Sequence, residues 1–455
     1  MSKNWVNAIL WLLLVLVIVI GAVLAKSPLP LRDWQQHPKA AFVLNQGRNP
    51  HVAELVYPPV KPLSTMAILG RKLFYDASLS GSGRLACASC HDPAHAYAPA
   101  NALSVQLGGP DMRQFGVRAV PSLTYLYRQP NFSIGPDNPA NENSNLLEAA
   151  ELAETHPLAP KQAIGKSRLV PQGGLFWDGR VNTLQQQAGG PLFNPLEMAA
   201  SSPAEVFAKL QHASYANDFT QLFGVNVWRQ PGLVVQEALF ALARYQIEDP
   251  SFHSFSSKFD AWLQGRARLS RAELRGYLAF NDPNKGNCAA CHVDKPTRDG
   301  LPPLFTDTQY EALGVPRNPA IPVNRNPHYA DLGLCGPYRT DLETQTQYCG
   351  MFLTPTLRNV ATRHAFFHNG YYHTLGQVLD FYRFRDVAPQ KIYPVLHGKV
   401  QQFDDLPSAY QKNVDTQDAP FGGKSGDAPH LSEQDKQNII AFLQTLTDGY
   451  VPASH

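Results

Sequence analysis

The sequence lacks a marked excess of charge of either sign. It holds 39 Lys and Arg against 37 Asp and Glu, a formal net charge of +2, and no long run of one sign. Because nucleic-acid-binding proteins carry a basic patch or stripe, this balance argues against nucleic acid as a partner. A strong strand pattern is also missing. The 455 residues include 38 prolines and are 44% hydrophobic, which indicates a folded chain of two to three domains with many ordered loops.

Cysteine is scarce, and most of it lies in one repeated pattern. Four of the six cysteines form two copies of Cys-x-x-Cys-His, at 87–91 and 288–292. Cys87, Cys90 and His91 make the first copy, and Cys288, Cys291 and His292 make the second. This pattern attaches haem c through two thioethers, and its histidine supplies an axial ligand to the iron. Zinc knuckles or redox dithiols are the alternatives, but zinc needs a second ligand pair, and only Cys335 and Cys349 remain. The sequence therefore predicts two covalently bound haem c groups.

The N-terminus carries an export signal. Residues 8–25 form an uninterrupted apolar run between Lys3 and Lys26. The run is short for a bilayer span and long for a signal peptide, and residues 23–25 resemble a cleavage site. We favour an uncleaved anchor over a cleaved signal. Lys3 keeps the leader inside, so the rest is exported. We expect a periplasmic protein anchored to the bacterial inner membrane.

Export bears on the two remaining cysteines. An oxidising compartment allows Cys335 and Cys349 to form a disulfide. The alternative is a pair of free thiols. We predict the disulfide.

Helical periodicity dominates the exported chain. We predict a mostly α fold of two cytochrome-c-like domains, each wrapping one covalent haem c; the haem motif is the only internal repeat. The expected division is an anchor or signal peptide at 1–25, a linker at 26–60, a first haem domain at 61–255 with an insertion at about 129–172, and a second haem domain at 256–455. The expected helices lie at 68–73, 146–154, 183–188, 203–223, 231–246, 270–280 and 432–447.

Several motifs in fixed order resemble one known family. They are the segments 69–76, 176–180, 195–198, 354–360 and 367–370, placed around the two haem motifs. Together they resemble the bacterial di-haem cytochrome c peroxidases and the related MauG enzymes. The resemblance implies that the first domain is peroxidatic and that the second transfers electrons.

The resemblance also implies roles for three side chains. Glu197 matches the family's catalytic glutamate and Gln187 a polar partner beside it. Trp177 matches a residue that relays electrons between the two haems. Without the resemblance, Trp177 would read as a core aromatic and Glu197 as a solvated surface residue.

Two positions depart from most peroxidases of the family. Many of these enzymes hold a removable histidine over the first iron, and that position aligns here with Leu107. His95 is too close to His91 to replace it. We therefore expect a five-coordinate or water-ligated first iron that needs no reductive priming.

The second departure concerns the second iron. Where the peroxidases place methionine, this chain has Tyr382, as MauG-like members do. A phenolate favours oxidised iron, whereas a thioether favours reduced iron. The other candidate ligands are Met351, His364, His368 and His373.

The family comparison also bears on calcium and on partners. The family's calcium-binding asparagine aligns with Ala119, which argues against calcium here. The expected reaction is reduction of hydrogen peroxide with electrons from a small c-type cytochrome or cupredoxin. The alternatives are MauG-like oxidation of tyrosine or tryptophan on a protein partner through a bis-ferryl state, and a non-catalytic di-haem electron carrier.

Overall fold

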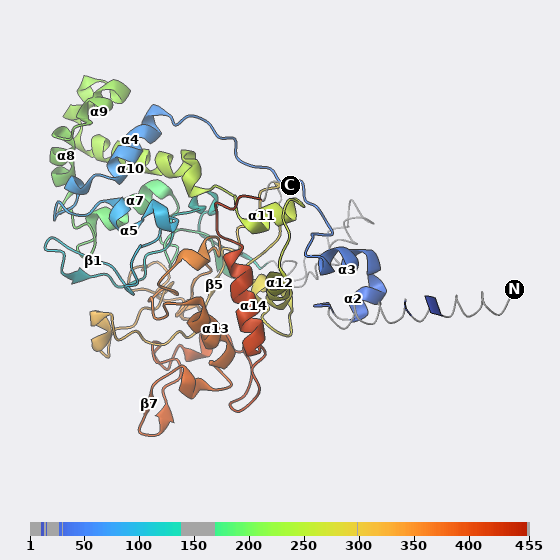
Figure 1. Cartoon of the computed structure of the whole chain (residues 1–455). Helices are drawn as coiled ribbons and strands as arrows, with labels where there is room; N and C mark the ends of the chain where they lie inside the picture. The colour runs from blue at the N-terminus through green and yellow to red at the C-terminus, as the bar shows by residue number, and fades with distance from the viewer. Residues whose placement is uncertain are drawn as a thin grey trace.

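The computed structural model arranges the chain as two helical lobes that face one another. It describes residues 11, 12, 15, 27–29, 31–137, 169–297 and 299–452, apart from the side chain at position 33. The first lobe holds α4 and α7–α10, and the second holds α11–α14 (Figure 1). Each lobe has its own apolar core, one drawn mainly from residues 69–252 and the other mainly from 259–446.

Helices supply most of the regular structure in the described residues, as the sequence predicts. Their bounds are α2 Leu31–Gln36, α3 Pro38–Asn45, α4 Thr65–Phe74, α5 Cys87–Cys90, α7 Leu184–Phe193, α8 Pro203–Gln211, α9 Ala216–Phe223, α10 Pro231–Glu248, α11 Lys258–Leu263, α12 Arg271–Asn281, α13 Leu375–Phe384 and α14 Glu433–Gln444. The helix expected over 203–223 is two helices, α8 and α9. Tyr215 lies between them, and its hydroxyl donates to the Asp76 carboxylate, which ties this corner to the turn that follows α4.

One helix crossing occurs in both lobes. In the first lobe α4 packs on α10, and a Cβ at Gly70 would lie only 1.9 Å from the Ala241 carbonyl oxygen. In the second lobe α12 packs on α14, and a Cβ at Gly276 would lie 1.9 Å from the Asn438 carbonyl oxygen. Both α4 and α12 are the α-helices that precede a Cys-x-x-Cys-His segment in the chain. The internal repeat therefore extends beyond the haem motif to the helix pair that supports it.

The strands are short antiparallel pairs that tie loops together. Their bounds are β1 Leu107–Gly108, β2 Gln114–Phe115, β3 Ser133–Pro136, β4 Leu169–Gln172, β5 Tyr310–Glu311, β6 Phe352–Leu353, β7 Val395–Leu396 and β8 Lys399–Val400. The pairs are β1–β2, β3–β4, β5–β6 and β7–β8, with Tyr310 opposite Leu353 in the third. The pair β3–β4 closes the base of the predicted insertion, whose expected helix at 146–154 lies outside the described residues.

The segment expected as a linker at 26–60 contains packed structure. Helices α2 and α3 lie beside the second lobe (Figure 1), and Ala41 and Leu44 are fully buried in its core. Residues 49–64 then cross without regular structure to α4. The predicted membrane anchor falls almost wholly outside the described residues. Within the part of the chain that is described, no helix is long and apolar enough to cross a membrane.

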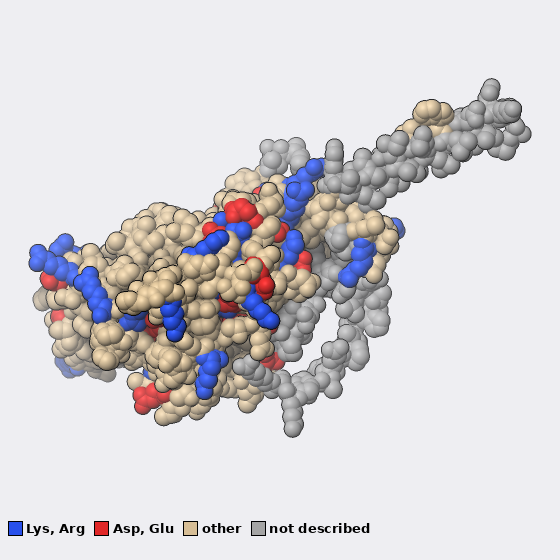
Figure 2. Space-filling view, turned by 90° about the horizontal axis from the view of Figure 1, so that it is seen from below, with Lys and Arg blue, Asp and Glu red and all other residues tan. Residues whose placement is uncertain are grey.

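The remaining two cysteines form the predicted bond, and the surface shows the mixed charge expected from the composition. Cys335 is joined to Cys349 by a disulfide, as predicted. On the face drawn in Figure 2, Lys and Arg side chains are scattered among uncharged ones, with acidic side chains between them.

Candidate functional site

Each lobe contains a cavity with a Cys-x-x-Cys-His segment in its wall. Residues lining the first cavity include Cys87, Cys90, His91, Leu107, Trp177, Gln187 and Glu197. Residues lining the second include Cys288, Cys291, His292, Met351, Arg363, His368 and Tyr382. Most of the side chains singled out in the sequence therefore belong to two sites.

The histidine of each motif is held in the same way. His91 Nδ1 donates to the Tyr97 carbonyl oxygen at 3.0 Å, and His292 Nδ1 donates to the Phe305 carbonyl oxygen at 3.0 Å. This fixes the tautomer and leaves Nε2 of each ring as the nitrogen without a proton. Burial lowers the pKa of both imidazoles to about 4, so both are neutral, as metal ligation requires.

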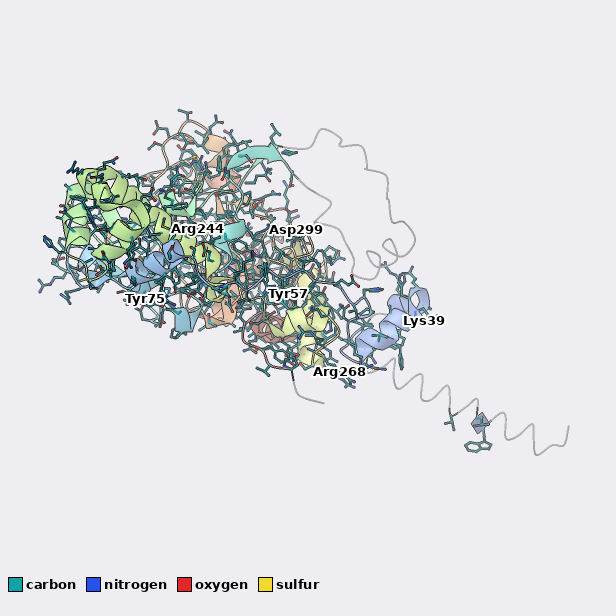
Figure 3. The ribbon with its side chains drawn as sticks, turned by 90° about the horizontal axis from the view of Figure 1, so that it is seen from above. Lys39, Tyr57, Tyr75, Arg244, Arg268 and Asp299 are labelled. Atoms are coloured by element: carbon teal, nitrogen blue, oxygen red, sulfur yellow. A yellow bond between two sulfur atoms is a disulfide. The ribbon has the colours of Figure 1, made fainter. Side chains whose placement is uncertain are left out.

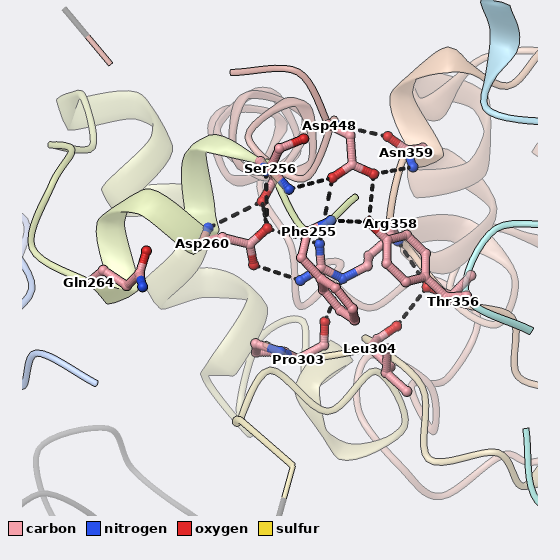
Figure 4. A network of polar contacts seen from close by, with 12 residues as sticks. Phe255, Ser256, Asp260, Gln264, Pro303, Leu304, Thr356, Arg358, Asn359 and Asp448 are labelled. Carbon is pink, nitrogen blue, oxygen red and sulfur yellow. Dashed lines mark hydrogen bonds and ion pairs between the residues drawn. The ribbon is translucent and has the colours of Figure 1, made fainter. Parts of the chain in front are cut away.

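A buried ion-pair network holds Pro303 and Leu304, which directly precede Phe305 (Figure 4). The Arg358 guanidinium donates to both Asp260 carboxylate oxygens, at 2.6 and 3.0 Å, and to the Pro303 carbonyl oxygen at 2.7 Å. The neighbouring Thr356 hydroxyl donates to the Leu304 carbonyl oxygen at 2.6 Å. These bonds fix residues 303–305, which explains how the 354–360 motif acts on the second site.

Glu197 lies in the wall of the first cavity. Its carboxylate accepts a hydrogen bond from Asn194 Nδ2 at 2.5 Å, and Gln187 lines the same cavity. Burial raises the pKa of Glu197, although Asn194 and Arg180 oppose this effect. A carboxyl group with a raised pKa inside a cavity is suited to accept and return a proton near neutral pH.

The rest of the first cavity offers no second imidazole. Leu107 lines it, whereas His95 does not; His95 instead pairs with the Asp92 carboxylate at 2.9 Å. Among the described residues that line this cavity, His91 is the only histidine. Met198 also lines the cavity.

Tyr382 is brought into the second cavity by α13. Its ring stacks on Phe421, with centroids 5.3 Å apart, and burial raises the pKa of its phenol. Met351 and His368 line the same cavity, but His364 and His373 do not. Three of the five candidate ligands, Tyr382, Met351 and His368, therefore line this cavity. His368 stacks on Phe352 at 3.5 Å, and no hydrogen-bond partner reaches its Nε2 among the described residues.

Trp177 lines both cavities. Its indole Nε1 donates to the Ala119 carbonyl oxygen at 2.8 Å, and its own carbonyl oxygen accepts from the Leu353 amide at 2.9 Å. Trp177 is therefore held from both sides of the gap, the region between the two cavities. Ala119 lines the first cavity and Leu353 lines the second.

Two buried arginines near this gap were not anticipated from the sequence. Arg118 donates to Asp331 through two nitrogens, each at 2.7 Å, and to Asp178 at 2.7 Å. Arg363 lines the second cavity and donates to the Val120 carbonyl oxygen at 3.1 Å. No carboxylate pairs with Arg363 in the described part of the chain. Because Val120 lines the first cavity, Arg363 lies between the two sites.

The residues present fit haem c at both sites. Each cavity supplies two free thiols for thioethers and one neutral imidazole for iron. Burial lowers the pKa of Arg363 only to about 10, so it stays cationic at neutral pH. A cation facing a cavity without a protein counter-ion suits a propionate. No sequence pattern marks Arg363, because its role depends on which cavity it faces.

Comparison with known proteins identifies the family. The family model for di-haem cytochrome c peroxidases matches residues 64–268. The methylamine utilization protein MauG of Paracoccus denitrificans is 32% identical over 392 residues, covering 84% of this chain and 88% of that protein. The chain belongs to the di-haem cytochrome c peroxidase and MauG family.

Two further relatives place the chain within this family. Cytochrome c551 peroxidase of Nitrosomonas europaea is 26% identical, covering 71% of this chain and 76% of that protein. The crystal structure of the diheme peroxidase BthA from Burkholderia thailandensis superposes with a TM-score of 0.72 at 35% identity, covering 88% of this chain and 91% of that one. The family resemblance seen in the motifs is confirmed, and the chain is an oxidoreductase of this peroxidase family.

Proposed function

We propose that the protein reduces hydrogen peroxide to water at the first site, with electrons that arrive through the second. The observation that carries this proposal is the asymmetry of the two cavities. The first combines a carboxylate, Glu197, with a wall in which His91 is the only histidine among the described residues. The second holds Tyr382 together with His292, and both would be available as ligands to an iron bound there.

The side chains of the first site have distinct tasks. His91, oriented by the Tyr97 carbonyl, holds the iron. Glu197, oriented by Asn194, takes a proton from bound peroxide and returns it to the departing oxygen. Gln187 adds a polar group beside Glu197. Haem, when bound, would supply the electrons that break the O–O bond.

The second site and Trp177 supply the return path for electrons. Trp177 lines both cavities, so its indole can divide the electron transfer between them into two shorter steps. A small c-type cytochrome or cupredoxin is the expected donor. The Ala119 carbonyl oxygen already accepts a hydrogen bond from Trp177, and the Arg118 guanidinium already lies between the Asp178 and Asp331 carboxylates. We therefore propose that no calcium ion binds between the two sites.

One observation favours a second function, the MauG-like oxidation of tyrosine or tryptophan on a protein partner. Tyr382 lines the second cavity where the methionine-ligated peroxidases have a thioether. A phenolate ligand stabilises oxidised iron. The second haem would then store an oxidising equivalent more readily than it would pass electrons from a donor to the first haem.

The cellular location follows from the chemistry of assembly. Haem c is attached on the outer side of the bacterial inner membrane, and the Cys335–Cys349 disulfide needs an oxidising compartment. We propose that the protein works in the periplasm. The apolar run at 8–25 is proposed to direct export and to anchor the chain to the inner membrane.

Stopped-flow spectroscopy tests these proposals. Mixing the resting holoprotein with one equivalent of hydrogen peroxide is expected to change the haem spectrum without prior reduction. Adding a reduced c-type cytochrome should then restore the resting spectrum and oxidise the cytochrome. No response to peroxide would indicate an electron carrier. A response that persists for minutes in the presence of reduced cytochromes and cupredoxins would favour the MauG-like function.

A further inference from the structure

A tyrosine adjoins the first haem site on the side of His91. The backbone carbonyl oxygen of Tyr97 accepts the hydrogen bond from His91 Nδ1, at 3.0 Å. Tyr97 is 2% exposed, and its ring stacks on Phe252 with centroids 3.7 Å apart. The covalent bonds of Tyr97 and one hydrogen bond therefore connect its phenol ring to the imidazole of His91.

The hydroxyl of Tyr97 begins a chain of hydrogen bonds that ends at a carboxylate. It contacts the Ser251 hydroxyl at 2.5 Å, and Ser251 donates to Asp249 Oδ1 at 2.6 Å. Tyr245, also 2% exposed, hydrogen-bonds the same phenol. A tyrosine phenol is neutral near neutral pH, so Tyr97 must release its proton when it loses an electron. The chain through Ser251 to Asp249 provides the route for that proton.

Aromatic rings continue from Tyr97 to the surface. The Phe74 ring lies 5.9 Å from Tyr97, 5.5 Å from Tyr245 and 5.4 Å from Tyr75, measured between centroids. Tyr75 caps the C-terminal end of α4 and is 50% exposed. Figure 3 shows Tyr75 at the outer edge of the first lobe, next to α4. The phenols at both ends of this path are thus separated by one buried ring.

We propose that Tyr97 is a redox relay that carries oxidising equivalents from the first haem site to Tyr75 at the surface. The relay rests on the proposed function, because peroxide supplies the oxidant. The relay would remove an oxidising equivalent from the first haem site when no electron donor is present. It follows a different direction from Trp177, which leads to the second cavity.

The step balances in electrons and protons. One electron passes from the Tyr97 ring to the peroxide-oxidised haem c held by His91, which is reduced by one electron. The Tyr97 proton passes to Ser251 as the Ser251 proton passes to Asp249, which leaves a neutral tyrosyl radical and a protonated carboxyl group. Tyr75 then gives one electron to Tyr97 and releases its proton to solvent, and Asp249 returns the relayed proton. One such passage consumes one of the two oxidising equivalents of one peroxide and leaves a neutral radical on Tyr75, which is the species that the spin trap captures in the test below.

The test uses the full holoprotein with two equivalents of hydrogen peroxide, no donor, and a nitroso spin trap. Mass spectrometry locates the trapped residues, and freeze-quench EPR detects the radical. The variants are Tyr97→Phe, which keeps the ring, and Asp249→Asn, which keeps an acceptor for Ser251. Tyr127→Phe is the matched control. It removes a buried hydroxyl in the same lobe that has no hydrogen-bond partner among the described residues.

We expect trap adducts on Tyr75 in the wild-type protein and in Tyr127→Phe. Tyr97→Phe and Asp249→Asn should each reduce these adducts at least tenfold, with unchanged resting haem spectra as evidence of folding. Wild-type labelling of Tyr75 in Tyr97→Phe would overturn the relay, and so would a wild-type protein that responds to peroxide without labelling Tyr75. A haem spectrum that does not respond to peroxide at all contradicts the proposed function itself, so the two failures can be told apart.

Discussion

Replacement of Glu197 by glutamine changes one property of the first cavity. The glutamine has nearly the same volume, and its carbonyl oxygen can still accept the hydrogen bond from Asn194 Nδ2 that the carboxylate accepts at 2.5 Å. What disappears is the ability to take a proton. The substitution therefore separates proton transfer from the shape of the site.

The expected loss follows from the size of general acid–base catalysis. Removing a positioned proton acceptor lowers a rate by about 10²- to 10⁴-fold, which is about 3 to 5 kcal/mol of activation free energy. Burial raises the pKa of Glu197. Because the ionised form accepts the proton, wild-type turnover should fall as the pH drops through a value above the usual glutamate range of about 4.3. In Glu197→Gln this acid limb should be absent from the residual rate.

The assay is steady-state oxidation of a reduced c-type cytochrome by peroxide, across pH, with haem content measured in each sample. Glu205→Gln is the matched control, because Glu205 lies on α8 in the same lobe and lines neither cavity. It should turn over as the wild type does. Turnover in Glu197→Gln within threefold of wild type, with both haems present, would refute the assignment of Glu197.

Three further changes test the second site and the frame around it. Tyr382→Met should raise the reduction potential of the second haem in a spectropotentiometric titration, because a thioether favours reduced iron; an unchanged potential argues against tyrosine ligation. Arg358→Met leaves Asp260 buried without its cation and should lower the free energy of unfolding by about 3 to 5 kcal/mol in guanidinium; a loss below about 1 kcal/mol contradicts the network. Replacing Cys335 and Cys349 by serine opens a loop of sequence separation 14 and should cost about 3 kcal/mol; an unshifted denaturation midpoint contradicts this.

The sequence predicts features that rest on local spacing. Cys-x-x-Cys-His fixes the placement of the thiols and imidazole in each cavity, because these groups lie within one turn. The long apolar stripe of α10 predicts a buried helix, and Val234, Ala238 and Leu242 are indeed buried. Tyr382 and Leu107 were located by counting from motifs, and each lines the expected cavity.

Short capped helices were missed although their signals are present. Helix α13, which carries Tyr382, begins at a capping box formed by Thr374 and Gln377. Helix α11 begins at a similar box formed by Ser257 and Asp260, next to the predicted domain boundary at 255–256. Helix α11 has only six residues, too few for a periodic pattern, so the cap is its main local cue. Helix α13 also has apolar residues at helical spacing, at positions 375, 378, 379 and 382, and so was predictable.

Features that depend on long-range contact could not be predicted. Gly70 and Gly276 permit the same close helix crossing in each lobe, but the two segments share little sequence beyond the glycine. Arg363 becomes a candidate propionate partner only because the fold places it between two cavities without a carboxylate in the described residues. The proton route from Tyr97 to Asp249 joins residues 152 positions apart.

The asymmetry of the two irons is tested most directly by the EPR spectrum of the resting, oxidised holoprotein at liquid-helium temperature. An iron held by His91 with no histidine opposite should give a high-spin ferric signal. An iron held by His292 and Tyr382 should give a low-spin signal, and Tyr382→Phe should convert that second signal alone. Two low-spin signals with no high-spin component would contradict the open first site.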